Sequence, residues 1–146
     1  MLIEFKFSNY RSFRDEAVLS MEATGLGTFR KSLIEYRPAG KSTNHPIHLL
    51  PAAAIYGKNG GGKSNVIRAF LAVQFIRNAQ RTQHEKAPIP VRPFLLDDTS
   101  AAEPTRFEFT YVDQGIKYIY GFAATKERVE EEYLYHAPKG QRSLVF

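Results

Sequence analysis

Eight consecutive residues carry the chemistry of a phosphate-binding loop. Residues 57–64 read Gly-Lys-Asn-Gly-Gly-Gly-Lys-Ser, which matches the pattern G-x-x-x-x-G-K-[ST] at every fixed position. The glycines that permit positive φ and a close approach of main-chain amides to phosphate are Gly57, Gly60, Gly61 and Gly62. The Lys63 ammonium would meet the β- and γ-phosphates, and the Ser64 hydroxyl would join the coordination shell of Mg²⁺. The alternative is a glycine-rich surface turn with a stray lysine.

Two predicted elements would hold this loop. The apolar run 49–56 leads into it and predicts a buried central strand. A helical pattern follows from Lys63 to about Ala79, and its apolar stripe consists of Val66, Ala69, Phe70, Val73 and Ile76. A strand, a glycine-rich loop and a helix in this order aim backbone N–H groups and a helix N-terminus at a chain of phosphates.

Alternating patterns predict antiparallel strands on both sides of the loop. Ile3, Phe5 and Phe7 share one face of a first strand, and residues 17–21 predict a second strand that returns beside it. Aromatic residues alternate over 107–111 and 116–122 around a turn at 113–115, which is typical of a hairpin. The run 129–135 suits a further strand, although Glu130–Glu132 could equally start a helix. A turn at 138–140 then leads to a final strand.

Long loops connect these elements within one domain over residues 1–146. Residues 24–46 and 81–105 are rich in turn-forming residues and predict long loops, the first with a short strand at 32–36. The resulting fold class is mixed α/β: an antiparallel meander beside a strand–loop–helix unit.

The motifs at the N-terminus and in the loop resemble one family when taken together. The chain begins Met-Leu-Ile-Glu-Phe-Lys-Phe-Ser-Asn-Tyr-Arg-Ser-Phe, and Asn59 and Asn65 extend the loop pattern to G-x-N-G-x-G-K-S-N. This pair resembles the SMC/RecF-like branch of the ABC-type P-loop ATPases. It is most similar to the bacterial AAA "ATP/GTP phosphatase" proteins linked to abortive infection and phage defence. The resemblance covers most of the chain, including residues 92–96 and the strands from 107 to 122.

The resemblance implies that the chain binds ATP and Mg²⁺ as the first lobe of an ATPase head. The implied ligand-binding residues are Gly57, Lys58, Asn59, Gly60, Gly61, Gly62, Lys63, Ser64 and Asn65 from the loop, with Arg11 and Ser12 from the N-terminal motif, and Ser64 as the Mg²⁺ ligand. A surface arginine at the end of a strand is the alternative for Arg11. No catalytic residue is assigned, because the signature motif, the Walker B strand and the switch histidine of such heads are not visible. The acidic run Phe94–Asp98 is interpreted as a surface turn, and Gln74, Gln80 and Gln83 remain unassigned.

The expected function is therefore ATP binding as the N-terminal part of an ATP-hydrolysing head, in DNA repair or phage defence. The last residues, 143–146, resemble a strand that is interrupted by the end of the sequence, so we expect an N-terminal fragment or truncated product. Such a fragment should hydrolyse little ATP on its own. A head-to-head homodimer is expected only when a second lobe is present. Two alternatives stay open: a non-catalytic lobe that binds nucleotide or protein, and a different P-loop enzyme such as a kinase or GTPase. No guanine-reading Asn-Lys-x-Asp occurs in the sequence, and an antiparallel last third is unlike a kinase.

The amino-acid composition limits the expected location and partners of the protein. The 146 residues include no cysteine, which excludes disulfides and thiolate metal sites and fits a cytoplasmic location. No apolar run reaches the roughly 18 residues needed to cross a bilayer, so no membrane partner is expected. The net charge of +5 permits DNA contact without requiring it, and the basic group Arg68, Arg77, Arg81 and Lys86 is interpreted as a solvated helix face. Aromatic residues that could hold an adenine (Tyr10, Tyr118, Tyr120 and Phe122) are expected to pack the sheet instead.

Overall fold

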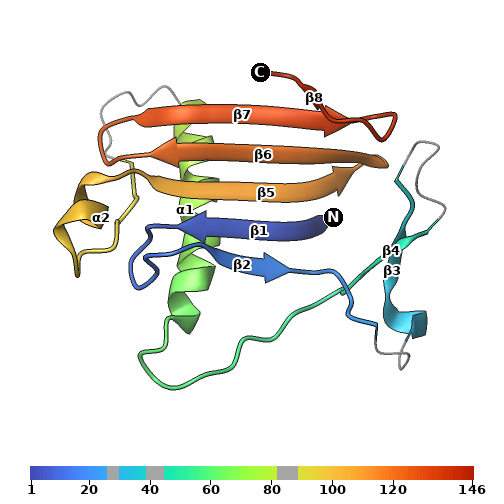
Figure 1. Ribbon diagram of the computed structural model, residues 1–146, viewed down its shortest axis with the longest axis horizontal. Coiled ribbons are helices and arrows are strands. Elements are labelled where there is room, and N and C mark those ends of the chain that lie inside the picture. The colour runs from blue at the N-terminus through green and yellow to red at the C-terminus, as the bar shows by residue number, and fades with distance from the viewer. Residues whose placement is uncertain (26–29, 39–44, 82–88) are drawn as a thin grey trace.

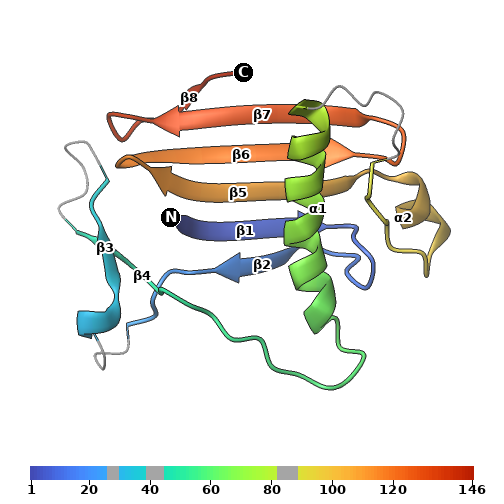
Figure 2. The same ribbon diagram turned by 180° about the vertical axis from the view of Figure 1, so that it is seen from behind.

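In the described residues a six-stranded antiparallel sheet carries the long helix on one face, and a separate two-stranded sheet lies beside it (Figures 1 and 2). The computed structural model describes residues 1–25, 30–38, 45–81 and 89–146, and for residues 75–81 it describes the backbone alone. The large sheet has the order β2-β1-β5-β6-β7-β8 and consists of β1 (Leu2–Ser8), β2 (Ala17–Ser20), β5 (Thr105–Asp113), β6 (Ile116–Ala124), β7 (Val129–Ala137) and β8 (Ser143–Leu144). The other elements are η1 (Arg30–Ser32), β3 (Ile34–Tyr36), β4 (Ile47–Leu49), α1 (Lys63–Arg81) and α2 (Asp98–Ala102). The mixed α/β class with an antiparallel sheet is thus confirmed.

The core lies between α1 and the sheet, where the alternating aromatic side chains of β1, β5 and β6 meet the helix. Phe5 is fully buried, and its ring centroid lies 4.1 Å from that of Phe70 on α1. Phe107 continues the layer, with its centroid 5.1 Å from that of Phe122. The predicted apolar stripe of the helix is confirmed for the four members whose side chains are described, Val66, Ala69, Phe70 and Val73. The fifth, Ile76, lies outside the described side chains.

The hairpins predicted in the last third are confirmed. β5 and β6 pair from Thr105↔Ala124 to Asp113↔Ile116, and Gln114 (φ 48°) and Gly115 (φ 80°) make the turn. Successive left-handed residues suit the twist of a two-residue hairpin, which explains the glycine. β7 is a strand along its whole length, so the alternative of a helix starting at Glu130 is wrong.

The predicted central strand over residues 49–56 is wrong for most of its length. β4 ends at Leu49, and residues 52–58 have no regular structure and are exposed, with 88% of the Tyr56 surface open to solvent. Pro51 has no N–H to donate to a ladder. Within the described ranges no strand pairs with residues 52–56, so their backbone groups stay in water. The segment 52–56 follows β4 and runs apart from the sheet toward the loop that leads into α1 (Figure 1).

The segment before β5 contains a short helix that the sequence did not predict. The Asp97 carboxylate caps α2, since it accepts a hydrogen bond of 2.6 Å from the Ser100 N–H. That bond, with further hydrogen bonds and the nearby charge of Arg14, lowers the pKa of Asp97. Leu96 is 87% exposed, so the interpretation of residues 94–98 as a surface turn holds and a buried acidic strand is excluded there.

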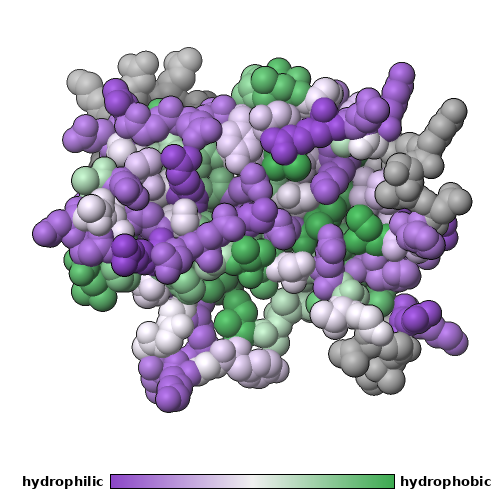
Figure 3. Space-filling view, in the orientation of Figure 1, coloured by the Kyte–Doolittle hydropathy of each residue, from purple (hydrophilic) through white to green (hydrophobic). Residues whose placement is uncertain are grey.

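The sheet face away from α1 is largely hydrophilic (Figure 3). The Lys6 ammonium lies 3.0 Å from the Glu4 carboxylate and 3.3 Å from that of Glu108. The hydrogen bond to Glu4, with that to Glu108, raises the pKa of Lys6 against the effect of its partial burial. The Tyr133 hydroxyl donates to Glu108 at 2.7 Å, and partial burial raises the pKa of the phenol. The sheet therefore buries mainly the face toward α1, although Thr110, Val112 and Ala123 on the other face are buried as well.

Gly121 makes room for the Tyr133 ring on this face. A Cβ at position 121 would collide with Cζ and Oη of Tyr133. We expect Gly121→Ala to lower the free energy of unfolding by about 1–2 kcal/mol, because the ring must move and its hydrogen bond to Glu108 is lost. Chemical denaturation measures this change. Gly25→Ala is the matched control, since nothing lies within 4 Å of a Cβ there. Equal stability of both variants would contradict the packing described.

Candidate functional site

The glycine-rich loop is curled in the structure. Gly60 (φ 80°) and Gly62 (φ 87°) adopt left-handed conformations, which side chains with a Cβ rarely take. The Gly61 N–H donates to the Lys58 carbonyl at 3.1 Å and closes the turn. The Asn65 N–H then donates to the Gly62 carbonyl at 2.8 Å, so the loop runs directly into the first turn of α1.

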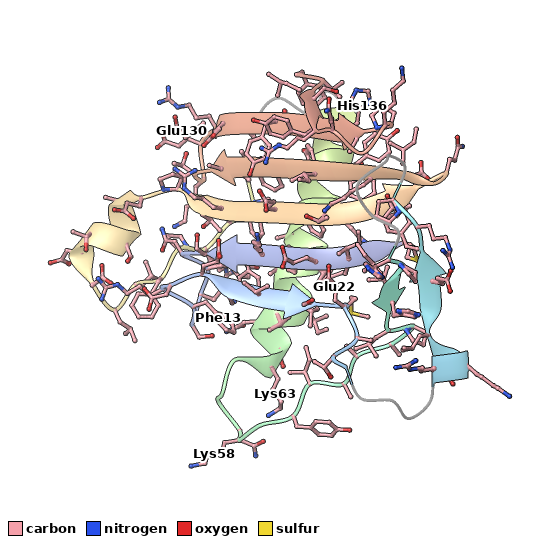
Figure 4. All side chains as sticks on the ribbon, turned by 45° about the vertical axis from the view of Figure 1, so that its right-hand side comes forward. Phe13, Glu22, Lys58, Lys63, Glu130 and His136 are labelled. Carbon is pink, nitrogen blue, oxygen red and sulfur yellow. The ribbon has the colours of Figure 1, made fainter. Side chains whose placement is uncertain are left out.

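Lys63, the first residue of α1, folds its side chain back over this loop. Its ammonium donates to the Gly57 carbonyl at 2.7 Å and to the Lys58 carbonyl at 2.8 Å. Figure 4 shows Lys58 near the tip of the loop and Lys63 at the base of the helix, both at the free lower end of the molecule. The ammonium is therefore held inside the curl, facing the backbone that the sequence predicts to hold phosphate.

The electrostatic potential at the N-terminus of α1 favours the binding of an anion. The helix runs for 19 residues, and its first turn contains no acidic side chain. Unpaired N–H groups at a helix N-terminus carry a partial positive charge, to which Lys58 and Lys63 add two formal charges. Ser64 is exposed at the same end. A negatively charged group with several acceptor oxygens is the ligand that such an arrangement suits.

The turn between β1 and β2 contacts the start of α1 through Ser12, one of the residues for which the N-terminal motif implies ligand binding. The Asn65 amide donates to the Ser12 hydroxyl at 2.9 Å. A Cβ at Gly62 would lie 3.0 Å from that hydroxyl oxygen and 3.1 Å from the ring of Phe13. The structure thus brings the two motifs together although about fifty residues separate them in sequence.

Arg11 lies beside Tyr10 in the same turn. Its backbone is left-handed (φ 54°), and its N–H donates to the Arg92 carbonyl at 2.8 Å. The Arg11 Nε donates to the Tyr10 hydroxyl at 3.2 Å, with the guanidinium carbon 5.5 Å from the Tyr10 ring centroid. The Tyr10 hydroxyl donates in turn to the Arg68 carbonyl of α1 at 3.2 Å. Arg11 therefore reaches the helix through Tyr10.

Sequence reasoning missed the residue that anchors this turn, Asn9. Its side-chain amide donates to the Ser100 and Glu103 carbonyls at 2.8 and 2.9 Å, and its carbonyl oxygen accepts from the Phe94 N–H at 2.9 Å. The residue is 5% exposed and left-handed, with φ 50°. An asparagine directly after an alternating strand is the available signal, because asparagine tolerates this conformation better than most residues.

A glycine-rich loop that enters a helix through a lysine and a serine is one part of the arrangement of a P-loop nucleotide-binding domain. The family described as "AAA domain, putative AbiEii toxin, Type IV TA system" matches residues 52–146, which include the loop, α1 and the strands β5 to β8. The match covers more than half of the chain, and the chain belongs to this family of AAA domains. The membership supports an ATPase-like, nucleotide-binding character, with which the mixed α/β fold is compatible. A comparison with curated proteins finds no match.

The described helices carry no candidate for a membrane span. Within those ranges, none combines the length and the apolarity that a bilayer crossing requires.

Proposed function

We propose that the chain binds ATP with Mg²⁺ through residues 57–64, as the N-terminal part of an ATP-hydrolysing head of the SMC/RecF-like type. The observation that carries the proposal is the Lys63 ammonium, which lies inside the curled loop within 2.8 Å of two loop carbonyls. Loop amides and this ammonium would hold the phosphates, and the Ser64 hydroxyl would hold the metal. Bound Mg²⁺ would neutralise charge on the β- and γ-phosphates.

The geometry of the loop fits a polyphosphate. Gly60 has open space where a Cβ would stand, so the backbone there can approach a ligand closely. To meet phosphate, the Lys63 ammonium must leave the carbonyls of Gly57 and Lys58. The donor is charged in both states, but phosphate oxygens carry formal charge and carbonyl oxygens do not, so the contact with phosphate adds an attraction between opposite charges. The exchange is therefore favourable once a nucleotide arrives.

Exposed apolar surface near the loop supports the proposal of a first lobe. Ile67 and Leu71, one helical turn apart on α1, are 55% and 56% exposed. Tyr56, just before the loop, is open to solvent as well. Apolar side chains gathered at one site on a surface mark a contact with another layer of protein. A second lobe with its own strands would cover α1 on this side and pair with residues 52–56.

Hydrolysis needs groups that the proposal assigns to other parts of a complete head. A water-orienting carboxylate at the end of a buried strand is required, and the acidic pair Asp97–Asp98 belongs to the surface turn and α2 instead. The chain alone should therefore bind ATP and turn it over slowly at most. Of the two processes proposed, phage defence is favoured over DNA repair by the toxin named in the family description. Within the same proposal, two complete heads would pair head to head. A complete head would also contact DNA.

Calorimetric titration with ATP, AMP and GTP, each with and without Mg²⁺, tests the proposed ligand. We expect saturable ATP binding with a dissociation constant below about 1 mM, equivalent to about 4 kcal/mol, and no saturation by AMP. Ser64→Ala should remove the gain in affinity due to Mg²⁺ and leave metal-free binding intact. Ser143→Ala in exposed β8 is the matched control. Equal binding of AMP and ATP would contradict the proposal, and a strong preference for GTP would favour the GTPase alternative.

A further inference from the structure

The turn at residues 9–13 is clamped between two parts of the molecule. On one side Asn9 binds the backbone around α2, and the Arg11 N–H donates to the Arg92 carbonyl. On the other side the turn reaches α1 at two places, one through Ser12 and one through Tyr10. The turn is thus a fixed platform against which the glycine-rich loop and the start of α1 can be set.

Tyr10 gives this platform its rigidity. Its side chain is 1% exposed, and its ring lies 5.6 Å from the Phe107 ring and 6.3 Å from the Phe7 ring, measured between centroids. The ring is packed edge-on against both. From that position its hydroxyl donates to the Arg68 carbonyl, so the second turn of the helix is tied to the core.

The contact nearer to the loop is the pair Ser12–Asn65. The Asn65 amide nitrogen donates to the Ser12 hydroxyl at 2.9 Å, and the amide oxygen accepts from the Arg68 guanidinium at 3.1 Å. Both ends of the asparagine side chain are therefore engaged within the protein. A residue in that state is poorly placed to meet a phosphate itself, but it can hold the helix that does.

The surroundings of Gly62 show how closely the loop lies against the turn 9–13. Its backbone is left-handed, and a Cβ there would come within 3.0 Å of the Ser12 hydroxyl and 3.1 Å of the Phe13 ring. The turn 9–13 therefore favours glycine at this position whether or not a ligand is bound. If the turn moved, the loop would lose the surface that confines its last residue before Lys63.

We propose that Ser12 and Asn65 are positioning residues, which hold the first turn of α1 against the turn 9–13 and so set the direction of the loop amides and of the Lys63 ammonium. This reassigns both residues from the direct ligand contacts that the sequence motifs imply. The effect on ATP affinity rests on the proposed function, whereas the effect on the loop itself does not.

Amide hydrogen exchange in the protein without ligand tests the positioning directly. The reporters are the N–H groups of Gly61, Asn65 and Val66, which bond within the loop and the first helical turn. Ser12→Ala and Asn65→Ala should each speed their exchange roughly threefold to tenfold, the effect of one lost hydrogen bond. Alanine is a better helix former than asparagine, so a simple change in helix propensity would act in the opposite direction.

Three further variants complete this test. The double variant Ser12→Ala/Asn65→Ala should exchange no faster than Asn65→Ala alone, because Asn65→Ala already removes the bond to Ser12 along with the bond from Arg68. Ser12→Thr keeps the hydroxyl and should retain protection. Gln74→Ala, on an exposed part of the same helix, is the matched control and should change nothing. Unchanged exchange in both single variants, or effects that add in the double variant, would overturn the proposal.

Titration of the same variants with ATP and Mg²⁺ separates positioning from direct contact. Positioning predicts that affinity falls by a similar factor in both single variants and in the double variant. Independent ligand contacts predict losses that multiply, and that result would also overturn the proposal. If the unmodified chain binds no ATP, the proposed function fails, while the exchange measurements still decide whether the pair positions the loop.

Discussion

Replacing Asn9 by alanine is expected to lower the free energy of unfolding by about 3 kcal/mol, because three buried or partly buried backbone groups lose a side-chain partner. The Ser100 and Glu103 carbonyls lose a donor, and the Phe94 N–H loses an acceptor. Because Asn9 is 5% exposed, water cannot readily reach these backbone groups to replace the lost hydrogen bonds. Chemical denaturation of the two proteins measures the difference.

Two variants separate the causes of this loss. Asn9→Gly removes the same hydrogen bonds but suits the left-handed backbone, so it should be less destabilising than Asn9→Ala by about 1 kcal/mol. Gln114→Ala is the matched control, because Gln114 is also left-handed (φ 48°) and is exposed in a hairpin turn. It should cost less than about 1 kcal/mol. An Asn9→Ala variant no less stable than Gln114→Ala would show that Asn9 does not anchor the turn.

Replacing Lys63 by alanine is expected to weaken ATP binding by roughly 10- to 100-fold, the effect of losing a charged hydrogen-bond partner. The free energy of unfolding should change little, because the two bonds that Lys63 makes are at an exposed loop. Titration calorimetry and denaturation of the same sample give both quantities. The combination distinguishes a ligand-binding lysine from a lysine that only closes the loop.

Lys58→Ala is the matched control for charge. It removes the same unit of charge from the same loop, but its side chain lies near the loop tip and points away from the curl (Figure 4). We expect a severalfold loss, as for one surface charge near an anion site. Equal losses in Lys58→Ala and Lys63→Ala would mean that net charge, rather than the placed ammonium, attracts the nucleotide.

The sheet and its helix were predictable because their side chains alternate or repeat with regular periods. Phe5 and Phe7 on β1 and Ala69 and Val73 on α1 fall on the buried faces that their spacing indicates. The turn at Gln114–Gly115 was predictable because a two-residue hairpin needs left-handed backbone. In each case a local rule and the tertiary packing agree.

The run 49–56 shows where such rules fail. Its composition predicts burial, but burial requires a neighbouring layer, and within the described residues no strand pairs with 52–56. The sequence did not predict α2 because the local signal of this helix is weak. Its five residues, Asp-Thr-Ser-Ala-Ala, are too few to show a helical period, and the cap at Asp97 stabilises the first turn.

The loop was predictable as a sequence pattern, but its support was not. Lys63 and the glycines are recognised from their spacing alone. The Ser12–Asn65 bond and the anchoring of Asn9 join residues that lie far apart in the chain, and no local pattern specifies such contacts. The likeness of the N-terminal motif to a known family implies a ligand-binding role for Ser12, which stays a prediction, whereas the contact of Ser12 with Asn65 is known from the structure alone.

The central claim is that main-chain amides of a curled loop wrap polyphosphate around one ammonium. Amide chemical shifts of residues 57–64, followed by NMR during titration with ATP and Mg²⁺, test it most directly. We predict saturable shifts concentrated at these amides, absent with AMP and strongly weakened in Lys63→Ala. Loop amides that stay unchanged at millimolar ATP, or shifts confined to another part of the chain, would contradict the account.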